Sequence, residues 1–197
     1  MYEFVSGYIQ RLVKLLESIE LQNICDIINL LDNIDPFVNT IYFIGNGGSA
    51  ATASHFANDI GIGLKIRGIK NINVVCLTDN IPVITSISND IGYENIFYAQ
   101  LKDKIKKGDL LFAISASGNS ANILKAAKYA KSVGALVIGC TGFDGGELKK
   151  LSDISFHVST EKGEYGIVED IHMILDHLIF SYFISTKEGA STKYVLE

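Results

Sequence analysis

The sequence predicts an α/β fold: a flavodoxin-like, doubly wound parallel sheet of five strands with N-terminal helices, forming a single domain over residues 1–186. Three observations predict it. A chain of 197 residues suits one domain of this kind. Its apolar residues, 48% of the total, are sufficient for a sizeable core. Short apolar runs alternate with segments of helical spacing, which implies right-handed crossovers and helices on both faces of a parallel sheet.

Strands are predicted where short runs rich in Ile, Val or Phe are bounded by turn residues, because strands buried on both faces have this pattern. These runs are residues 40–44, 72–77, 110–114, 135–140 and 154–158. Helical spacing covers residues 3–32, as one helix or two, and then 49–62, 81–88, 91–105, 121–133, 147–151 and 167–185. Residues 187–197 are predicted to be a polar C-terminal tail.

Composition excludes several classes of function. The net charge of −5 and the scattered basic residues argue against nucleic acid as a partner. No apolar run reaches about 18 residues without a charge, so no membrane span is expected, and the N-terminus lacks the pattern of a signal peptide. Three cysteines without C-x-x-C spacing predict buried free thiols in a reducing compartment, which indicates a cytoplasmic protein.

The turn at residues 45–49 follows the first predicted strand and reads Gly-Asn-Gly-Gly-Ser. Its glycines allow the backbone to turn sharply and to approach an anion, and Ser49 can cap the next helix. An ordinary turn with an N-cap explains it equally well. The pattern Gly45-x-Gly47-x-x-Ala50 also matches a dinucleotide fingerprint, with Asp79 as the acidic residue, but a lone match is weak.

The turn at residues 115–120, Ser-Ala-Ser-Gly-Asn-Ser, is more informative. It places three hydroxyls and an amide at a helix N-terminus, where free N–H groups and the helix dipole favour an anion. A simple cap needs only one such residue. Neither turn contains lysine or arginine, so the pattern predicts a site for a phosphate monoester rather than a triphosphate.

Titratable side chains gather on two predicted helices. His55 and Asp59, four residues apart, share one helix face. Four more lie on an otherwise apolar late helix: Glu169, His172, Asp176 and His177. Solvated polar faces would have the same pattern. Two histidines with two carboxylates are nonetheless suited to aldose–ketose isomerisation, which needs one group to remove a proton beside a carbonyl and another to move a hydroxyl proton. The same groups could bind zinc.

Taken in order, these motifs resemble the phosphoheptose isomerases of the sugar-isomerase (SIS) domain proteins, over residues 1 to about 185. The resemblance is carried by residues 45–50, His55-Phe56-Ala57, Asn89-Asp90, residues 115–120, residues 141–146, and Ile171-His172 with His177. It implies a homotetramer, a bound zinc in some members, and conversion of sedoheptulose 7-phosphate to a D-glycero-D-manno-heptose 7-phosphate. That reaction supplies heptose for lipopolysaccharide or capsule.

The resemblance also implies roles for particular residues. Asp59 and His177 are the expected catalytic acid and base. Zinc is expected at His55, Asp59, Glu169 and His177. Ser115, Ser117 and Ser120 are expected to hold the phosphate. The other expected substrate-binding residues are Asn46, Gly47, Ser49, Asp90, Asn119 and Glu169.

The chain departs from the family pattern around this site. Asp59 stands where the family has a catalytic glutamate, one methylene longer. The family has threonine, arginine, aspartate and glutamine at Ala116, Gly63, Gly166 and Glu169. A base misplaced by about 1 Å can cost on the order of a hundredfold in rate. The sequence therefore leaves open a non-catalytic SIS-domain protein that binds a sugar phosphate or a protein partner. The negative charge of Glu169, by contrast, favours a divalent metal.

Overall fold

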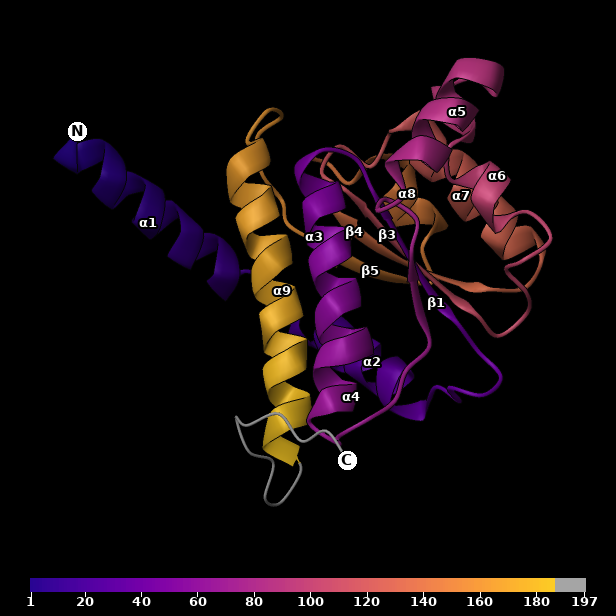
Figure 1. The fold of residues 1–197 in the computed structure, drawn as a ribbon. Coiled ribbons are helices and arrows are strands. Elements are labelled where there is room, and N and C mark those ends of the chain that lie inside the picture. Colours follow the sequence, from indigo (N-terminus) through magenta and orange to yellow (C-terminus); the bar gives the residue numbers. More distant parts are fainter. Residues whose placement is uncertain (187–197) are drawn as a thin grey trace.

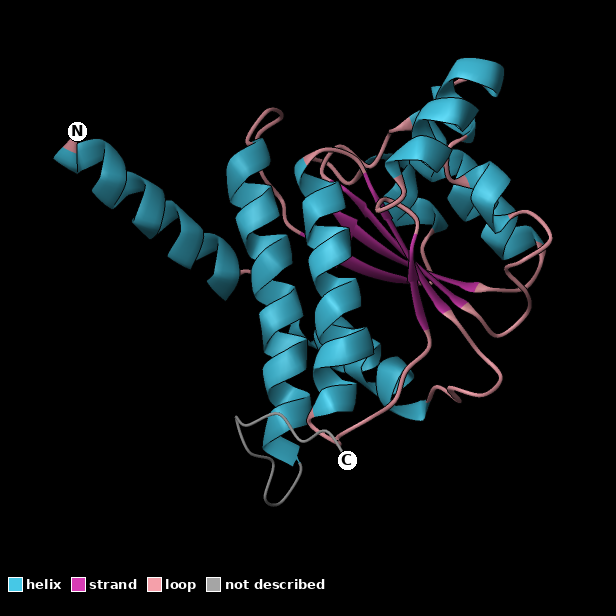
Figure 2. Ribbon diagram, viewed as in Figure 1, coloured by secondary structure: helices cyan, strands magenta, loops and turns pink. Residues whose placement is uncertain are grey.

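A five-stranded, all-parallel sheet in the order β2-β1-β3-β4-β5 forms the centre of the fold (Figures 1 and 2). The structure is a computed structural model that describes residues 1–186, so the predicted tail at 187–197 lies outside the described residues. The strands are β1 (Ile41–Gly45), β2 (Val74–Cys76), β3 (Leu110–Ser115), β4 (Leu136–Thr141) and β5 (Ile154–His157). The predicted α/β class and parallel sheet are confirmed.

Helices cover both faces of the sheet, as the apolar runs of the central strands require. On one face lie α2 (Leu21–Asn33), α3 (Gly48–Phe56) and α9 (Tyr165–Thr186), over a core in which Phe43, Phe56 and Phe112 contact one another. The other face packs against α6 (Tyr98–Leu101), α7 (Ala121–Ser132) and α8 (Gly146–Leu151). Strands β1 and β3 are buried along their whole length.

The helix predicted at residues 49–62 is a composite. α3 continues directly into a π-helix, η1 (Ala57–Gly63), and then into α4 (Leu64–Ile66). Two glycines of η1 allow close packing: a Cβ on Gly61 would lie 3.2 Å from Val74, and one on Gly63 would lie 3.0 Å from the Phe180 ring. π-helical turns are rare and often occur at functional sites. This one contains Asp59.

The predicted helix over residues 91–105 is wrong. α5 (Ile81–Ile91) is followed by Gly92, whose φ of +94° cannot continue a right-handed helix. A 3-10 turn, η2 (Tyr93–Asn95), follows, and then the short α6. The buried apolar residues behind that prediction belong to one core cluster, but only Leu101 of them lies in a helix: Ile96, Phe97, Leu101 and Ile105.

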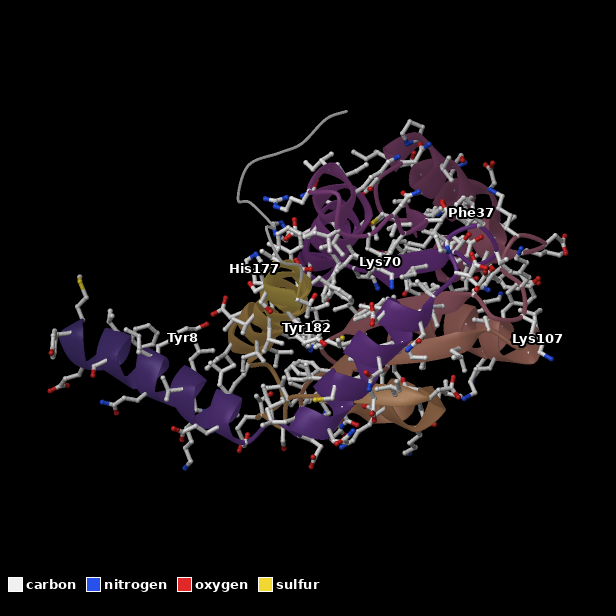
Figure 3. The ribbon with its side chains drawn as sticks, turned by 90° about the horizontal axis from the view of Figure 1, so that it is seen from below. Tyr8, Phe37, Lys70, Lys107, His177 and Tyr182 are labelled. Atoms are coloured by element: carbon white, nitrogen blue, oxygen red, sulfur yellow. The ribbon has the colours of Figure 1, made fainter. Side chains whose placement is uncertain are left out.

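Helix α1 (Tyr2–Glu17) extends away from the body of the molecule (Figures 1 and 3). Leu15 is its one buried residue. Tyr8 Oη donates to Asp170 Oδ2 at 2.5 Å, and Arg11 Nη2 lies 3.1 Å from Glu164 Oε2. The middle of α1 therefore contacts the N-terminal end of α9. Its exposed large apolar residues are Tyr2, Phe4, Val5, Tyr8, Ile9 and Val13.

All three cysteines are free, as predicted, but only Cys140 is buried, while Cys76 is half-buried and Cys25 is exposed. It lies on the outer face of α2, beside the buried Ile24. None of the helices within residues 1–186 combines the length and apolar character needed to cross a membrane.

Candidate active site

A small cavity of about 130 Å³ lies at the carboxyl ends of β1 and β3. It is lined by Asn46, Ser49, Ile114, Ser115, Ala116, Ser117, Ser120, Tyr165 and Glu169. We call it the anion pocket. Because Gly45 pairs with Ile114 in the sheet, the turns that follow these two strands lie side by side. The pocket thus brings together both turns that the sequence singled out, at the edge where α/β sheets bind ligands.

The serine turn is fixed by the neighbouring β4–α8 turn. Gly118 has a φ of +61°, and a Cβ there would lie 2.0 Å from the Gly145 carbonyl oxygen, so only glycine fits. Asn119 donates from Nδ2 to the Ser117 carbonyl at 3.1 Å and accepts from the Glu147 N–H at 3.1 Å. Asn119, predicted to bind substrate, thus holds the loop in shape and does not line the pocket.

The glycine turn is fixed by paired amides. Asn46 and Asn122 donate to each other's Oδ1, both at 2.9 Å, and Tyr93 Oη donates to Asn46 Oδ1 at 2.8 Å. Gly47 has a φ of +55° and precedes α3, while Ser49 lies buried in its first turn. Asp90, also predicted to bind substrate, lies exposed at the end of α5 and outside the lining of the pocket.

Glu169 of α9 is the one ionisable carboxylate among the lining residues. Its carboxyl group covers Gly48: a Cβ on Gly48 would lie 2.2 Å from Glu169 Oε2. Burial and the nearby Asp170 raise the pKa of Glu169 above its usual value. Within residues 1–186, the pocket wall therefore carries one carboxyl group, that of Glu169, and no cationic side chain.

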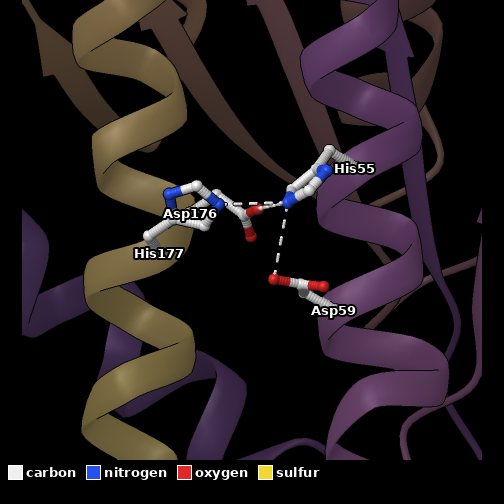
Figure 4. A group of neighbouring side chains, drawn as sticks. All are labelled: His55, Asp59, Asp176 and His177. Atoms are coloured by element: carbon white, nitrogen blue, oxygen red, sulfur yellow. Dashed lines mark hydrogen bonds and ion pairs between the residues drawn. The ribbon is translucent and has the colours of Figure 1, made fainter.

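Four titratable side chains from two helices form a second group, the His/Asp group (Figure 4). Its members are His55 of α3, Asp59 of η1, and Asp176 and His177 of α9, with one ligand atom from each within 4.8 Å of the others. His55 Nε2 lies 3.1 Å from His177 Nε2, and 3.6 Å from Asp59 Oδ2 and from Asp176 Oδ2.

This arrangement places two carboxyl groups, those of Asp59 and Asp176, close together. The side chain of Asp176 is 0% exposed, and neither of its oxygens has a hydrogen-bond partner within residues 1–186. Burial, and next the charge of Asp59, raise the pKa of Asp176 to about 8. A buried carboxylate without a hydrogen bond is costly, so Asp176 must hold a proton or lie beside a cation.

The group fits a metal ion. Two Nε2 atoms 3.1 Å apart cannot both donate a hydrogen, so at least one presents a lone pair to the centre of the group. Ligand atoms of a tetrahedral zinc site, about 2.0–2.2 Å from the metal, lie roughly 3.3 Å apart. The separations of 3.1 and 3.6 Å are close to that edge length. Two imidazoles and two carboxylates are an acceptable zinc set.

The structure separates Glu169 from the other three residues expected to bind zinc. Glu169 and His177 are eight positions apart, or about 12 Å of helix at 1.5 Å per residue. Asp176 occupies the fourth position instead. His172 lies elsewhere too: it is fully buried, 3.3 Å from the Thr141 carbonyl oxygen, and burial lowers its pKa to about 4.

Sequence reasoning named Asp176 but gave it no role. A signal was present, since Val168, His172, Asp176, Ile179 and Phe183 form the buried stripe of α9. A carboxylate in such a stripe needs a partner. Tyr165, which lines the anion pocket and packs edge-on against Phe143 at 4.9 Å, had no comparable signal.

Comparison with known proteins supports one assignment. Residues 7–142 match the model of the SIS domain. A phosphoheptose isomerase of Aliarcobacter butzleri is 40% identical over 143 residues, 72% of this chain and 73% of that protein. One from Helicobacter pylori is 34% identical over 170 residues, 86% of each chain.

The fold agrees with this assignment. The structure of a phosphoheptose isomerase from Neisseria gonorrhoeae superposes with a TM-score of 0.80, at 29% identity, over 93% of this chain and 98% of that one. The chain therefore belongs to the SIS domain family and, within it, to the phosphoheptose isomerases.

Proposed function

We propose that this protein is an aldose–ketose isomerase that converts sedoheptulose 7-phosphate to a D-glycero-D-manno-heptose 7-phosphate, a step of heptose biosynthesis for lipopolysaccharide or capsule. One observation carries the proposal. The hydroxyl-lined anion pocket and the His/Asp group lie at two different positions along the same pair of packed helices, α3 with its continuation η1, and α9. The names of the relatives and the structural likeness support it.

The separation of the two regions suits a long substrate. From Ser49 to His55 there are six residues, about 9 Å of helix, and from Glu169 to His177 about 12 Å. A seven-carbon ketose phosphate carries its phosphate at one end and its reactive carbons at the other. With the phosphate at Ser115, Ser117 and Ser120, an extended chain directs its first two carbons towards the His/Asp group.

The chemistry needs two proton transfers. Asp59, with 13% of its side chain exposed, is the proposed base that removes the proton beside the carbonyl. His177, on the exposed side of the group, is proposed to move the hydroxyl proton. His55 contacts both and can hold either in orientation. The shorter aspartate requires the substrate to approach the π-helix more closely than a glutamate would.

A divalent metal, zinc being the first choice, would be held by His55, Asp59, Asp176 and His177. When bound, it supplies Lewis-acid polarisation of an oxygen. Proton transfer by Asp59 and His177 requires these two residues to be free of the metal. Ligation by all four residues therefore suits a structural or inactive form, and ligation by fewer suits catalysis.

We further propose a cytoplasmic homotetramer. The exposed apolar face of α1 exceeds what one subunit can cover, since Leu15 alone is buried. Neighbouring subunits are the expected cover. Three free cysteines support a reducing location. Light scattering at micromolar concentration tests the assembly, and a monomer would contradict it.

The activity test is incubation of the purified protein with sedoheptulose 7-phosphate in D₂O, followed by NMR. The expected result is a heptose 7-phosphate with deuterium at C2, because the base exchanges its proton with solvent. A His177→Gln variant is the negative control. Absence of product, both with added zinc and after chelation, would contradict the proposal. Calorimetric binding without turnover would instead support the non-catalytic alternative.

A further inference from the structure

The anion pocket has an unusual charge balance. Its polar lining consists of an amide, a phenol, four serine hydroxyls and the carboxyl group of Glu169. Phosphate sites usually gain affinity from arginine or lysine. Here the charged residue of the lining is Glu169, a carboxylic acid. A phosphate dianion bound at the serines is repelled by an ionised carboxylate a few ångströms away.

Glu169 is free to interact with a ligand. None of the hydrogen bonds or ion pairs formed within residues 1–186 involves its carboxyl group. The group lies over the first turn of α3, where the helix dipole favours negative charge. A side chain on Gly48 would fill the same space, since its Cβ would lie 2.2–2.4 Å from the carboxyl atoms. Glycine at position 48 therefore leaves room for this carboxyl group at the pocket wall.

The size of the pocket fixes which part of the ligand Glu169 meets. A cavity of about 130 Å³ holds a phosphate group and little more. Glu169, on the wall of the pocket, is therefore expected to contact the carbons of the ligand that follow the ester oxygen. A hydroxyl there can donate to Glu169, and hydrogen bonds to charged acceptors are about twice as strong as neutral ones. A methylene there leaves the repulsion uncompensated.

We propose that Glu169 is a specificity-determining residue, which makes the anion pocket select phosphate monoesters with a hydroxyl on the carbon next to the ester carbon and discriminate against esters that lack it. This inference rests on the proposed function for the location of the phosphate. It adds a substrate class, polyol phosphates, and a penalty against simple alkyl phosphates. Sugar phosphates satisfy the requirement.

Calorimetry on the full-length protein with two small esters tests the inference. Glycerol 3-phosphate carries the hydroxyl, and n-propyl phosphate has the same carbon chain without it. We expect wild type to prefer glycerol 3-phosphate by about tenfold, which is the lower end of the range for a hydrogen bond to a charged group. In Glu169→Gln the preference should fall to about twofold, mainly because n-propyl phosphate binds several-fold more tightly once the repulsion is removed.

Asp170→Asn is the matched control. It removes the same charge one residue further along α9, but Asp170 faces Tyr8 of α1 and does not line the pocket. Its ester preference should equal that of wild type. Circular dichroism confirms that each variant is folded. An equal preference in wild type and Glu169→Gln, or an equal loss in Asp170→Asn, would overturn the inference.

The outcome is separable from that of the proposed function. A protein that shows this selectivity but does not isomerise the heptulose phosphate would contradict the function and leave the inference standing. An active enzyme with no selectivity between the two esters would support the proposed function and contradict the inference. Failure of both esters to bind wild type at millimolar concentration would overturn the placement of the phosphate and the inference together.

Discussion

The anion pocket and the His/Asp group are built in different ways. The pocket takes most of its polar atoms from two short turns, each contiguous in sequence, and fixes them with neutral hydrogen bonds such as the Asn46–Asn122 amide pair. The His/Asp group takes two residues from each of two helices that are more than a hundred residues apart in the chain, and all four members can titrate.

This difference predicts different consequences of mutation. A pocket lined by several equivalent hydroxyls distributes its binding energy, so the loss of one hydroxyl costs little. A compact group of charges acts as a unit, because each member sets the protonation of the others. The loss of one member should therefore abolish its chemistry. The predictions below test this contrast, from the largest expected effect to the smallest.

The largest effect is expected from His177→Gln. Loss of a general acid–base group costs about 10²–10⁴-fold in rate, so we expect kcat to fall about a thousandfold. Affinity for a phosphate ester should remain at the wild-type value, because the pocket lies about 12 Å away along α9. Steady-state kinetics and calorimetry measure the two quantities. His157→Gln, in β5, is the control and should keep most of the activity. A matching loss of ester affinity in His177→Gln would show that the two regions are not separate.

The next prediction concerns His172, which lies on α9 between the two regions. Burial lowers its folded-state pKa to about 4, whereas the unfolded chain titrates near 6.5. Between these values the unfolded state binds more protons, so stability is full above pH 6.5 and falls as the pH drops towards 4. From pH 7 to 5 this amounts to about 2 kcal/mol. Urea unfolding of wild type and His172→Asn at both pH values, at fixed protein concentration, measures it. The variant should lose less stability on acidification, and equal losses would contradict the assignment.

The same contrast explains what the sequence could predict. The strands could be predicted because each is a short continuous apolar run. The serine turn could be predicted because Ser115, Ser117 and Ser120 lie within six residues. Helical spacing placed His55 and Asp59 on one face. All of these are local patterns, which the physical chemistry of a single segment determines.

What could not be predicted depends on packing between segments. Asp176, and not Glu169, completes the His/Asp group because the C-terminal end of α3 packs against that part of α9. No local sequence pattern shows where two helices pack against each other. Gly92, by contrast, could have warned against a helix over residues 91–105. Asn119 has an amide side chain that could contact a ligand. Its Oδ1 instead accepts from the Glu147 N–H, which comes from a neighbouring turn.

The third prediction tests which carboxylate belongs to the metal site. Asp176→Asn should lower zinc affinity at least tenfold, since it replaces a charged ligand by a neutral one. Glu169→Gln is the matched variant on the same helix, and it should leave zinc affinity unchanged. Elemental analysis of protein purified without chelator, and then competition with a zinc-binding dye, give the values. The opposite ranking of the two variants would restore the ligand set that the family resemblance implied. Less than about a tenth of an equivalent of metal, with no gain on adding zinc, would remove the metal site altogether.

The smallest effect is expected at the serine turn. In Ser120→Ala, the phosphate loses one hydroxyl donor while Ser115, Ser117 and the N-terminus of α7 remain. A net hydrogen bond is worth about 1 kcal/mol, so affinity for a sugar phosphate should fall roughly fivefold. KM should rise by a similar factor, with kcat nearly unchanged, because the lost contact is the same in the ground state and the transition state. Ser117→Ala should behave alike, and Ser132→Ala, at the far end of α7, is the control. Unchanged affinity in both pocket variants would remove the phosphate from this turn. A loss of a hundredfold from either would show that the pocket, like the His/Asp group, depends on every member.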